Sequence, residues 1–198
     1  MEPYFLTNHL AGLLLLVTTQ AWGAMELSQR SANTQGRQGA TKVGGVGSRV
    51  AMLAALIATT IVVNLAPHAV PAAAIRPGAV AFAAGIAILA GGLVLRGWSI
   101  MTLGDYFTGR VMVSTDQPVI TAGPYRVLRH PSYTGFLLAC AGIGLAAANW
   151  ASLAIMVLLP LAVFFWRIRA EESALLATLG DRYACYAAQH KRLVPFVW

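Results

Sequence analysis

The chain has 198 residues, of which 58% are hydrophobic and 11% are charged. Soluble domains usually carry about 25% charged residues, so this composition excludes an ordinary soluble protein and predicts an integral membrane protein. The formal net charge of +7 would suit a nucleic-acid partner, but the basic residues lie beside apolar stretches and form no stripe interleaved with aromatics. We therefore assign them to headgroup contacts and membrane topology.

Five apolar stretches predict five transmembrane helices. The first covers residues 4–24 and can also be read as a signal peptide, but its start holds Glu2 and no Lys or Arg, which favours a retained helix. A loop rich in Ser, Gly and Gln follows it. The other four spans are expected, in chain order, at about residues 50–65, 78–95, 131–148 and 151–166.

The tail from Glu171 predicts an amphipathic helix at the membrane surface, followed by an extended end. Leu175, Leu179 and Tyr183 recur there at helical spacing. The sequence therefore predicts an all-α fold: one membrane domain, with three spans in residues 1–95 and the connection, a helical hairpin and the tail in residues 96–198.

The distribution of basic residues predicts the orientation of this domain. Thirteen of the 14 Lys and Arg residues fall in the loop after the first span, the connection after the third or the tail, and Arg76 falls on the other side. Under the positive-inside rule, the N-terminus is outside and the C-terminus is cytosolic, in the inner membrane if the host is a prokaryote.

A polar, basic and aromatic stretch from Ala122 to Gly135 lies between two of these spans. Pro131 suits the first position of a helix, and His130, which precedes a proline, is biased to an extended conformation outside it. The free N–H groups and the dipole of that helix end favour an anion.

A second polar cluster, Arg167 to Glu172, ends the last apolar stretch. If the last two spans form a hairpin, both clusters meet on one side of the membrane, where carboxylates are costly and tend to be functional. The sequence holds no HExxH, P-loop or GxSxG motif, and Cys140 and Cys185 lack metal-ligand spacing, so we expect neither zinc nor a disulfide.

The motifs of these clusters come in a definite order: Gly-x-Tyr-x-x-x-Arg-His-Pro-Ser-Tyr-x-Gly at 123–135, Asn-Trp at 149–150, Arg-x-x-x-Glu-Glu at 167–172 and Leu-Gly-Asp-x-Tyr at 179–183. Leu-Gly at 103–104 and Arg-x-x-Pro at 192–195 accompany them. Over about residues 95–198 this set resembles the isoprenylcysteine carboxyl methyltransferase family.

The resemblance implies S-adenosylmethionine as the methyl donor, bound from the cytosol. Arg167 matches the arginine at the acceptor, which is the catalytic position. Gln117 stands where the family often has a histidine, and Arg110 stands where we expect a neutral amide. The positions matching cofactor contacts are Gln117, Pro118, Val119, Ile120, Tyr125, His130, Pro131, Ser132, Tyr133 and Glu171.

The chemistry of these residues suits that donor. The helix start and His130 can bind its carboxylate, Glu171 can pair with its ammonium or ribose, and tyrosine faces attract a sulfonium. A carboxylate acceptor needs no general base, and Arg167 would orient it. An amine or phenol would need a base, for which His130 or a glutamate is the candidate.

The acceptor is expected to be lipophilic and to enter from the bilayer. A prenylated protein terminus, an isoprenoid acid, another small lipophile and an amine-bearing lipid all stay open. The competing functions are a phospholipid-type N-methyltransferase, an NADPH-dependent membrane reductase with a similar Arg-His-Pro segment, and a non-catalytic membrane protein whose polar clusters anchor headgroups.

Overall fold

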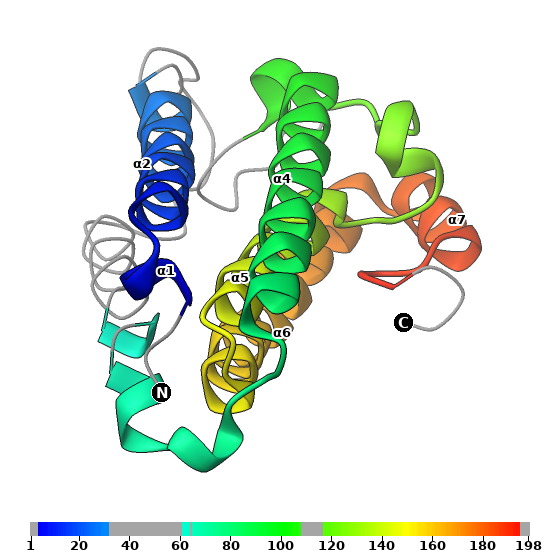
Figure 1. The fold of residues 1–198 in the computed structure, drawn as a ribbon. Coiled ribbons are helices and arrows are strands. Elements are labelled where there is room, and N and C mark those ends of the chain that lie inside the picture. Colours follow the sequence, from blue (N-terminus) through cyan, green and yellow to red (C-terminus); the bar gives the residue numbers. More distant parts are fainter. Residues whose placement is uncertain (1–3, 32–60, 64, 108–116, 195–198) are drawn as a thin grey trace.

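The computed structural model describes residues 4–31, 61–63, 65–107 and 117–194. The regular structure in these ranges is helical, with two isolated β-bridges, so the all-α prediction is confirmed for the described part. The main helices are α2 (His9–Ser31), α4 (Gly78–Leu103), α5 (Pro131–Ala146), α6 (Trp150–Leu179) and α7 (Asp181–Gln189). The central three form one group, with α2 on one side and α7 on the other (Figure 1).

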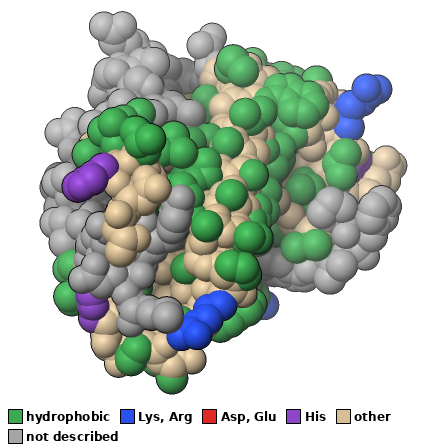
Figure 2. Space-filling model, viewed as in Figure 1, with side chains coloured by type: hydrophobic (Ala, Val, Ile, Leu, Met, Phe, Trp, Pro, Cys, Tyr) green, Lys and Arg blue, Asp and Glu red, His purple; other side chains and the backbone are tan. Residues whose placement is uncertain are grey.

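Among the described helices, α4 and α6 are long and apolar enough to cross a membrane. Their 26 and 30 residues correspond to about 39 and 45 Å, more than the roughly 30 Å of a bilayer core. Figure 2 shows hydrophobic side chains spread along the central part of one face. The apolar part of α2 and the whole of α5 are shorter. The span predicted at residues 50–65 lies almost entirely outside the described residues, so the number of five spans stays a prediction.

Glycines bring α4 and α5 into backbone contact. A Cβ atom on Gly92 would lie 2.5 Å from the amide nitrogen of Ala139, and one on Gly142 would lie 2.4 Å from that of Leu89. Small residues at such positions let membrane helices approach closely, where dispersion contacts replace the missing hydrophobic driving force. The pair therefore forms a closely packed unit that carries the Ala122–Gly135 stretch at one end.

The turn between α5 and α6 is built on Asn149, which is 1% exposed. Its side-chain oxygen caps α6 by accepting hydrogen bonds from the amides of Ala151 (2.9 Å) and Ser152 (3.2 Å). Its side-chain amide donates to the carbonyl of Val70 at 3.0 Å. The short gap between the spans expected at about residues 131–148 and 151–166 is therefore a tight turn.

The predicted boundary between the last span and the tail helix is wrong. α6 runs without a break past Pro160 and through Glu171, and ends at Gly180, which has a φ of 55°. The charged residues end the apolar part of α6 but not the helix itself. The chain keeps its helical backbone beyond the apolar part, and the charged side chains project from that extension. The separate tail helix is α7, which begins at Asp181.

Candidate active site

The start of α5 places His130 at the helix N-cap, with φ −126° and ψ 55°, and Pro131 at the first helical position. The His130 carbonyl accepts hydrogen bonds from the amides of Tyr133 (3.0 Å) and Thr134 (3.2 Å). A 3-10 helix, Gly123–Arg126, brings the chain into this position. The helix start predicted from the proline is therefore confirmed.

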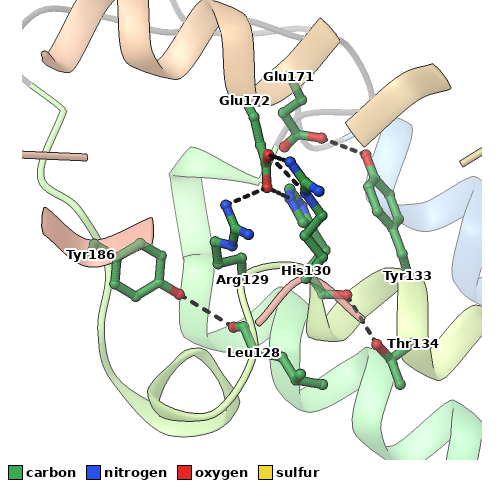
Figure 3. A network of polar contacts seen from close by, with 9 residues as sticks. Leu128, Arg129, His130, Tyr133, Thr134, Glu171, Glu172 and Tyr186 are labelled. Carbon is green, nitrogen blue, oxygen red and sulfur yellow. Dashed lines mark hydrogen bonds and ion pairs between the residues drawn. The ribbon is translucent and has the colours of Figure 1, made fainter. Parts of the chain in front are cut away.

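The two polar clusters meet, as predicted. The Tyr133 hydroxyl donates to Oε2 of Glu171 at 2.7 Å, and Nε of Arg167 donates to the same hydroxyl at 2.8 Å. Figure 3 shows the glutamates of α6 facing the start of α5. A carboxylate and a guanidinium on one helix are thus joined through a single hydroxyl on another.

The neighbouring carboxylate, Glu172, has different surroundings. Its Oε1 lies 2.8 Å from Nη1 of Arg129 and 3.1 Å from Nε2 of His130 (Figure 3). Its Oε2 accepts from Nε and Nη2 of Arg192, at 3.0 and 2.9 Å. Glu172 is 6% exposed, so two guanidinium groups and an imidazole surround a buried carboxylate. Glu171, by contrast, is partly exposed and bonded to Tyr133.

Ring stacking fixes the orientation of Tyr133. Its ring lies between those of His130, with a centroid distance of 5.5 Å, and Phe164, at 4.6 Å, and is nearly parallel to both. This packing holds the Tyr133 hydroxyl at the point where Glu171 and Arg167 reach it.

Comparison with known proteins identifies the central part of the chain. Residues 84–177 match the sequence profile of the isoprenylcysteine carboxyl methyltransferase (ICMT) family. This part of the chain is therefore similar to that family. The matched range runs from within α4 to near the end of α6 and includes both polar clusters of the site.

Individual relatives agree with the family match. Protein-S-isoprenylcysteine O-methyltransferase B of Arabidopsis thaliana is 32% identical over 115 residues, which cover 57% of this chain and 58% of that protein. The enzyme of Tribolium castaneum is 33% identical over 115 residues, which cover 57% and 41%. The chain thus matches less than two thirds of the length of these relatives.

A solved structure is also similar. The eukaryotic intramembrane Ras methyltransferase ICMT superposes with a TM-score of 0.63 and 27% identity, over 78% of this chain and 55% of that one. The ICMT-like fold therefore extends beyond the residues that match the family profile.

Arg96 is a part of this polar site that the sequence did not single out. It lies in α4, is 7% exposed, and its Nη1 donates to the carbonyl (3.0 Å) and to the hydroxyl (2.8 Å) of Ser132. Its guanidinium carbon lies 5.3 Å from the centre of the Phe136 ring. One signal in the sequence could have revealed it. The helical pattern continues past Arg96 to Leu103, and an arginine inside such a helix needs a buried partner.

The remaining predicted cofactor positions fall into two groups in the structure. Pro131 and Ser132 are buried in the first turn of α5. The Gln117–Ile120 segment lies outside regular structure, and its Val119 packs against a buried cluster of Leu179, Tyr183 and Tyr186. Arg110 lies outside the described residues.

Tyr125 joins this second group through its carbonyl, which accepts a 2.9 Å hydrogen bond from the Tyr186 hydroxyl. Burial, and then the nearby Glu171 carboxylate, raise the pKa of Tyr125 well above its usual value. Its hydroxyl is therefore protonated at any physiological pH and acts as a neutral polar group beside the site.

Proposed function

We propose that this chain transfers the methyl group of S-adenosylmethionine to a carboxylate on a lipophilic acceptor, at the cytosolic face of the membrane. The observation that carries the proposal is the Arg167–Tyr133–Glu171 array. In this array a carboxylate and a guanidinium of α6 are joined by the Tyr133 hydroxyl. The array lies at the polar end of the apolar part of α6. The ICMT relatives supply the reaction class.

The residues fit the donor's charges. Glu171 is a partly exposed carboxylate for its ammonium or ribose, and the positive end of the α5 dipole attracts its carboxylate, although the amides of His130, Tyr133 and Thr134 are already bonded within the protein. The buried Tyr183 hydroxyl, for which the described residues offer no hydrogen-bond partner, lies in the cluster that contacts Val119 and can bond an uncharged polar part. When bound, S-adenosylmethionine supplies an electrophilic methyl group on a sulfonium.

Arg167 would orient the acceptor carboxylate. Its Nε is held by Tyr133, so the position of the guanidinium is set before an acceptor arrives. A carboxylate is already nucleophilic at neutral pH, and alignment with the methyl group is what the protein must provide. Charge is lost as the two ions react, so the water-poor membrane boundary favours the step.

The same contacts favour a carboxylate over an amine acceptor. An amine would need a base to take its proton, and His130 is the imidazole at hand. Its Nε2 is already bonded to the buried Glu172, and the ring is stacked on Tyr133. His130 therefore serves the structure of the site, Glu172 is paired with two arginines, and Glu171 is the group we assign to the donor. With no base left for an amine, an isoprenylcysteine-like or other isoprenoid acid is the acceptor class we propose.

Purified protein with methyl-labelled S-adenosylmethionine tests this function. An isoprenylated N-acetylcysteine should accept label, and its methyl ester should not. Label in phosphatidylethanolamine would instead support an N-methyltransferase. Oxidation of NADPH without label transfer would support a reductase, and absence of donor binding would leave a non-catalytic membrane protein.

A further inference from the structure

α7 contacts the loop that leads into α5. The Tyr186 hydroxyl donates to the carbonyls of Tyr125 (2.9 Å) and Leu128 (3.3 Å), as Figure 3 shows for Leu128. Burial raises the pKa of Tyr186 to about 12, so this hydroxyl remains a donor at physiological pH. One hydroxyl of α7 thereby hydrogen-bonds two carbonyls of the loop.

The segment after α7 pairs with the same loop through its backbone. The amide of Arg129 donates to the carbonyl of Lys191 at 2.7 Å, and the amide of His130 donates to that of Arg192 at 3.0 Å. The Thr134 hydroxyl donates to the carbonyl of Leu193 at 2.8 Å. These bonds fix the two residues that precede Pro131 and the first turn of α5.

The carboxylate of Glu172 connects α6 to both the loop and the C-terminal segment. Glu172 on α6 binds Arg192 of the C-terminal segment through two nitrogens and, through its other oxygen, Arg129 and His130 of the loop. Three elements that are far apart in the sequence therefore meet at one side chain. Charge-assisted and forked hydrogen bonds of this kind set geometry more strictly than neutral ones do.

We propose that Glu172 and Arg192 are positioning residues for the donor site: together they clamp the C-terminal segment and the Arg129–His130 loop onto α6. The clamp keeps the α5 N-terminus and Tyr133 in register with Glu171, although neither Glu172 nor Arg192 contacts the donor. This inference rests on the proposed function, because the effect of the clamp is measured as binding of the donor.

Arg192 is the residue to change first. Without it, Glu172 keeps Arg129 and His130 as partners, so the buried carboxylate stays compensated. The backbone bonds of Lys191 and Arg192 to the loop do not need the side chain. Arg192→Gln should therefore fold, whereas Glu172→Gln leaves the Arg129 side chain without its carboxylate.

Calorimetry with S-adenosylhomocysteine on the full chain tests the clamp. Arg192→Gln should weaken binding roughly tenfold, the loss typical of one charged hydrogen-bonded partner, and raise the donor KM with little change in the acceptor KM. Arg192→Lys should recover part of the loss, because it restores the charge but not the fork. Lys191→Gln is the matched control: it removes the same charge from the exposed adjacent side chain and should bind as the unmodified chain does.

A spin label on Cys185 provides a readout independent of the reaction. Cys185 is exposed on α7, whereas Cys140 is buried. The label should become more mobile in Arg192→Gln and stay unchanged in Lys191→Gln and in Glu171→Gln, which should lose donor binding by removing a direct contact. Unchanged donor affinity in Arg192→Gln, or an equal loss in Lys191→Gln, would overturn the clamp. If the unmodified chain bound no donor, the proposed function would fail, and label mobility would still decide whether Arg192 holds α7 in place.

Discussion

Both ends of α5 are tied to segments far away in the sequence, but by different chemistry. At the Ala146 end, neutral Asn149 is fully buried and uses both its oxygen and its amide. At the Pro131 end, charged residues crowd together, and one of them, Glu171, stays partly exposed. A saturated neutral residue stabilises a turn, whereas an accessible charge at a membrane boundary can bind a ligand.

The largest effect should come from Arg167→Ala at the charged end. Methyl transfer should fall about a hundred- to a thousandfold, the loss expected when one preorganised donor is removed, while donor affinity is unchanged. Arg169→Ala is the control, because that guanidinium lies over the Phe165 ring at 4.2 Å on an exposed part of the same helix. Steady-state transfer together with calorimetry measures both; equal rates in the two variants would remove Arg167 from the acceptor site.

Gly142→Val should damage both ends, because it separates the helices that carry them. The new Cβ would lie 2.4 Å from the Leu89 amide nitrogen, so the backbones must move apart, at about 3 kcal/mol of unfolding free energy. Gly91→Ala has open space around its Cβ and should instead stabilise α4 slightly. Denaturation in detergent compares them, and a Gly142→Val protein as stable as Gly91→Ala would contradict the close packing.

Asn149→Ala should affect the neutral end alone. It removes the α6 cap and leaves the Val70 carbonyl without this donor, at about 2 kcal/mol in total. Asn149→Ser keeps a capping oxygen and should cost about half as much. Transfer per folded molecule should be unchanged in both. A selective loss of turnover would show that this end also serves the reaction.

The smallest effect is expected from Tyr186→Phe, at about 1 kcal/mol for the hydrogen bonds to Tyr125 and Leu128. The pKa of Tyr186 is raised to about 12 from an ordinary value near 10, so the folded state favours the protonated hydroxyl. The stability difference from the variant should therefore be constant below pH 10 and shrink as the pH rises from 10 to 12. Unfolding titrations at pH 8 and above check this, and a difference that grew with pH would refute the assignment.

Local rules predicted much of the site. The proline at 131 predicted the start of α5, and the short gap between the last two predicted spans favoured the hairpin that brings the clusters together. Those signals depend on residues near each other in the chain, and the structure confirms both. The meeting of the two polar clusters also followed from the hairpin, since Tyr133 and Glu171 each lie near its polar end.

The hydrogen-bond partners of residues far apart in the sequence could not be predicted in the same way. Nothing in the spacing says that Glu172 rather than Glu171 binds His130, because consecutive helical residues differ by about 100° in direction and the helix rotation is set by packing. The partners of Arg96 and Arg192 depend on α4 and on the C-terminal segment. The continuation of α6 was missed because charge was read as a helix end.

The unbroken course of α6 links the site to the lipid around it. Arg167 and Glu171 are one turn apart on a helix whose apolar part is long enough to cross a bilayer, and Tyr133 belongs to a different helix. A helix adapts to a bilayer of another thickness by changing its tilt. Such a tilt would shift the two α6 residues together against the tyrosine, and turnover should then vary with the acyl-chain length of the host membrane.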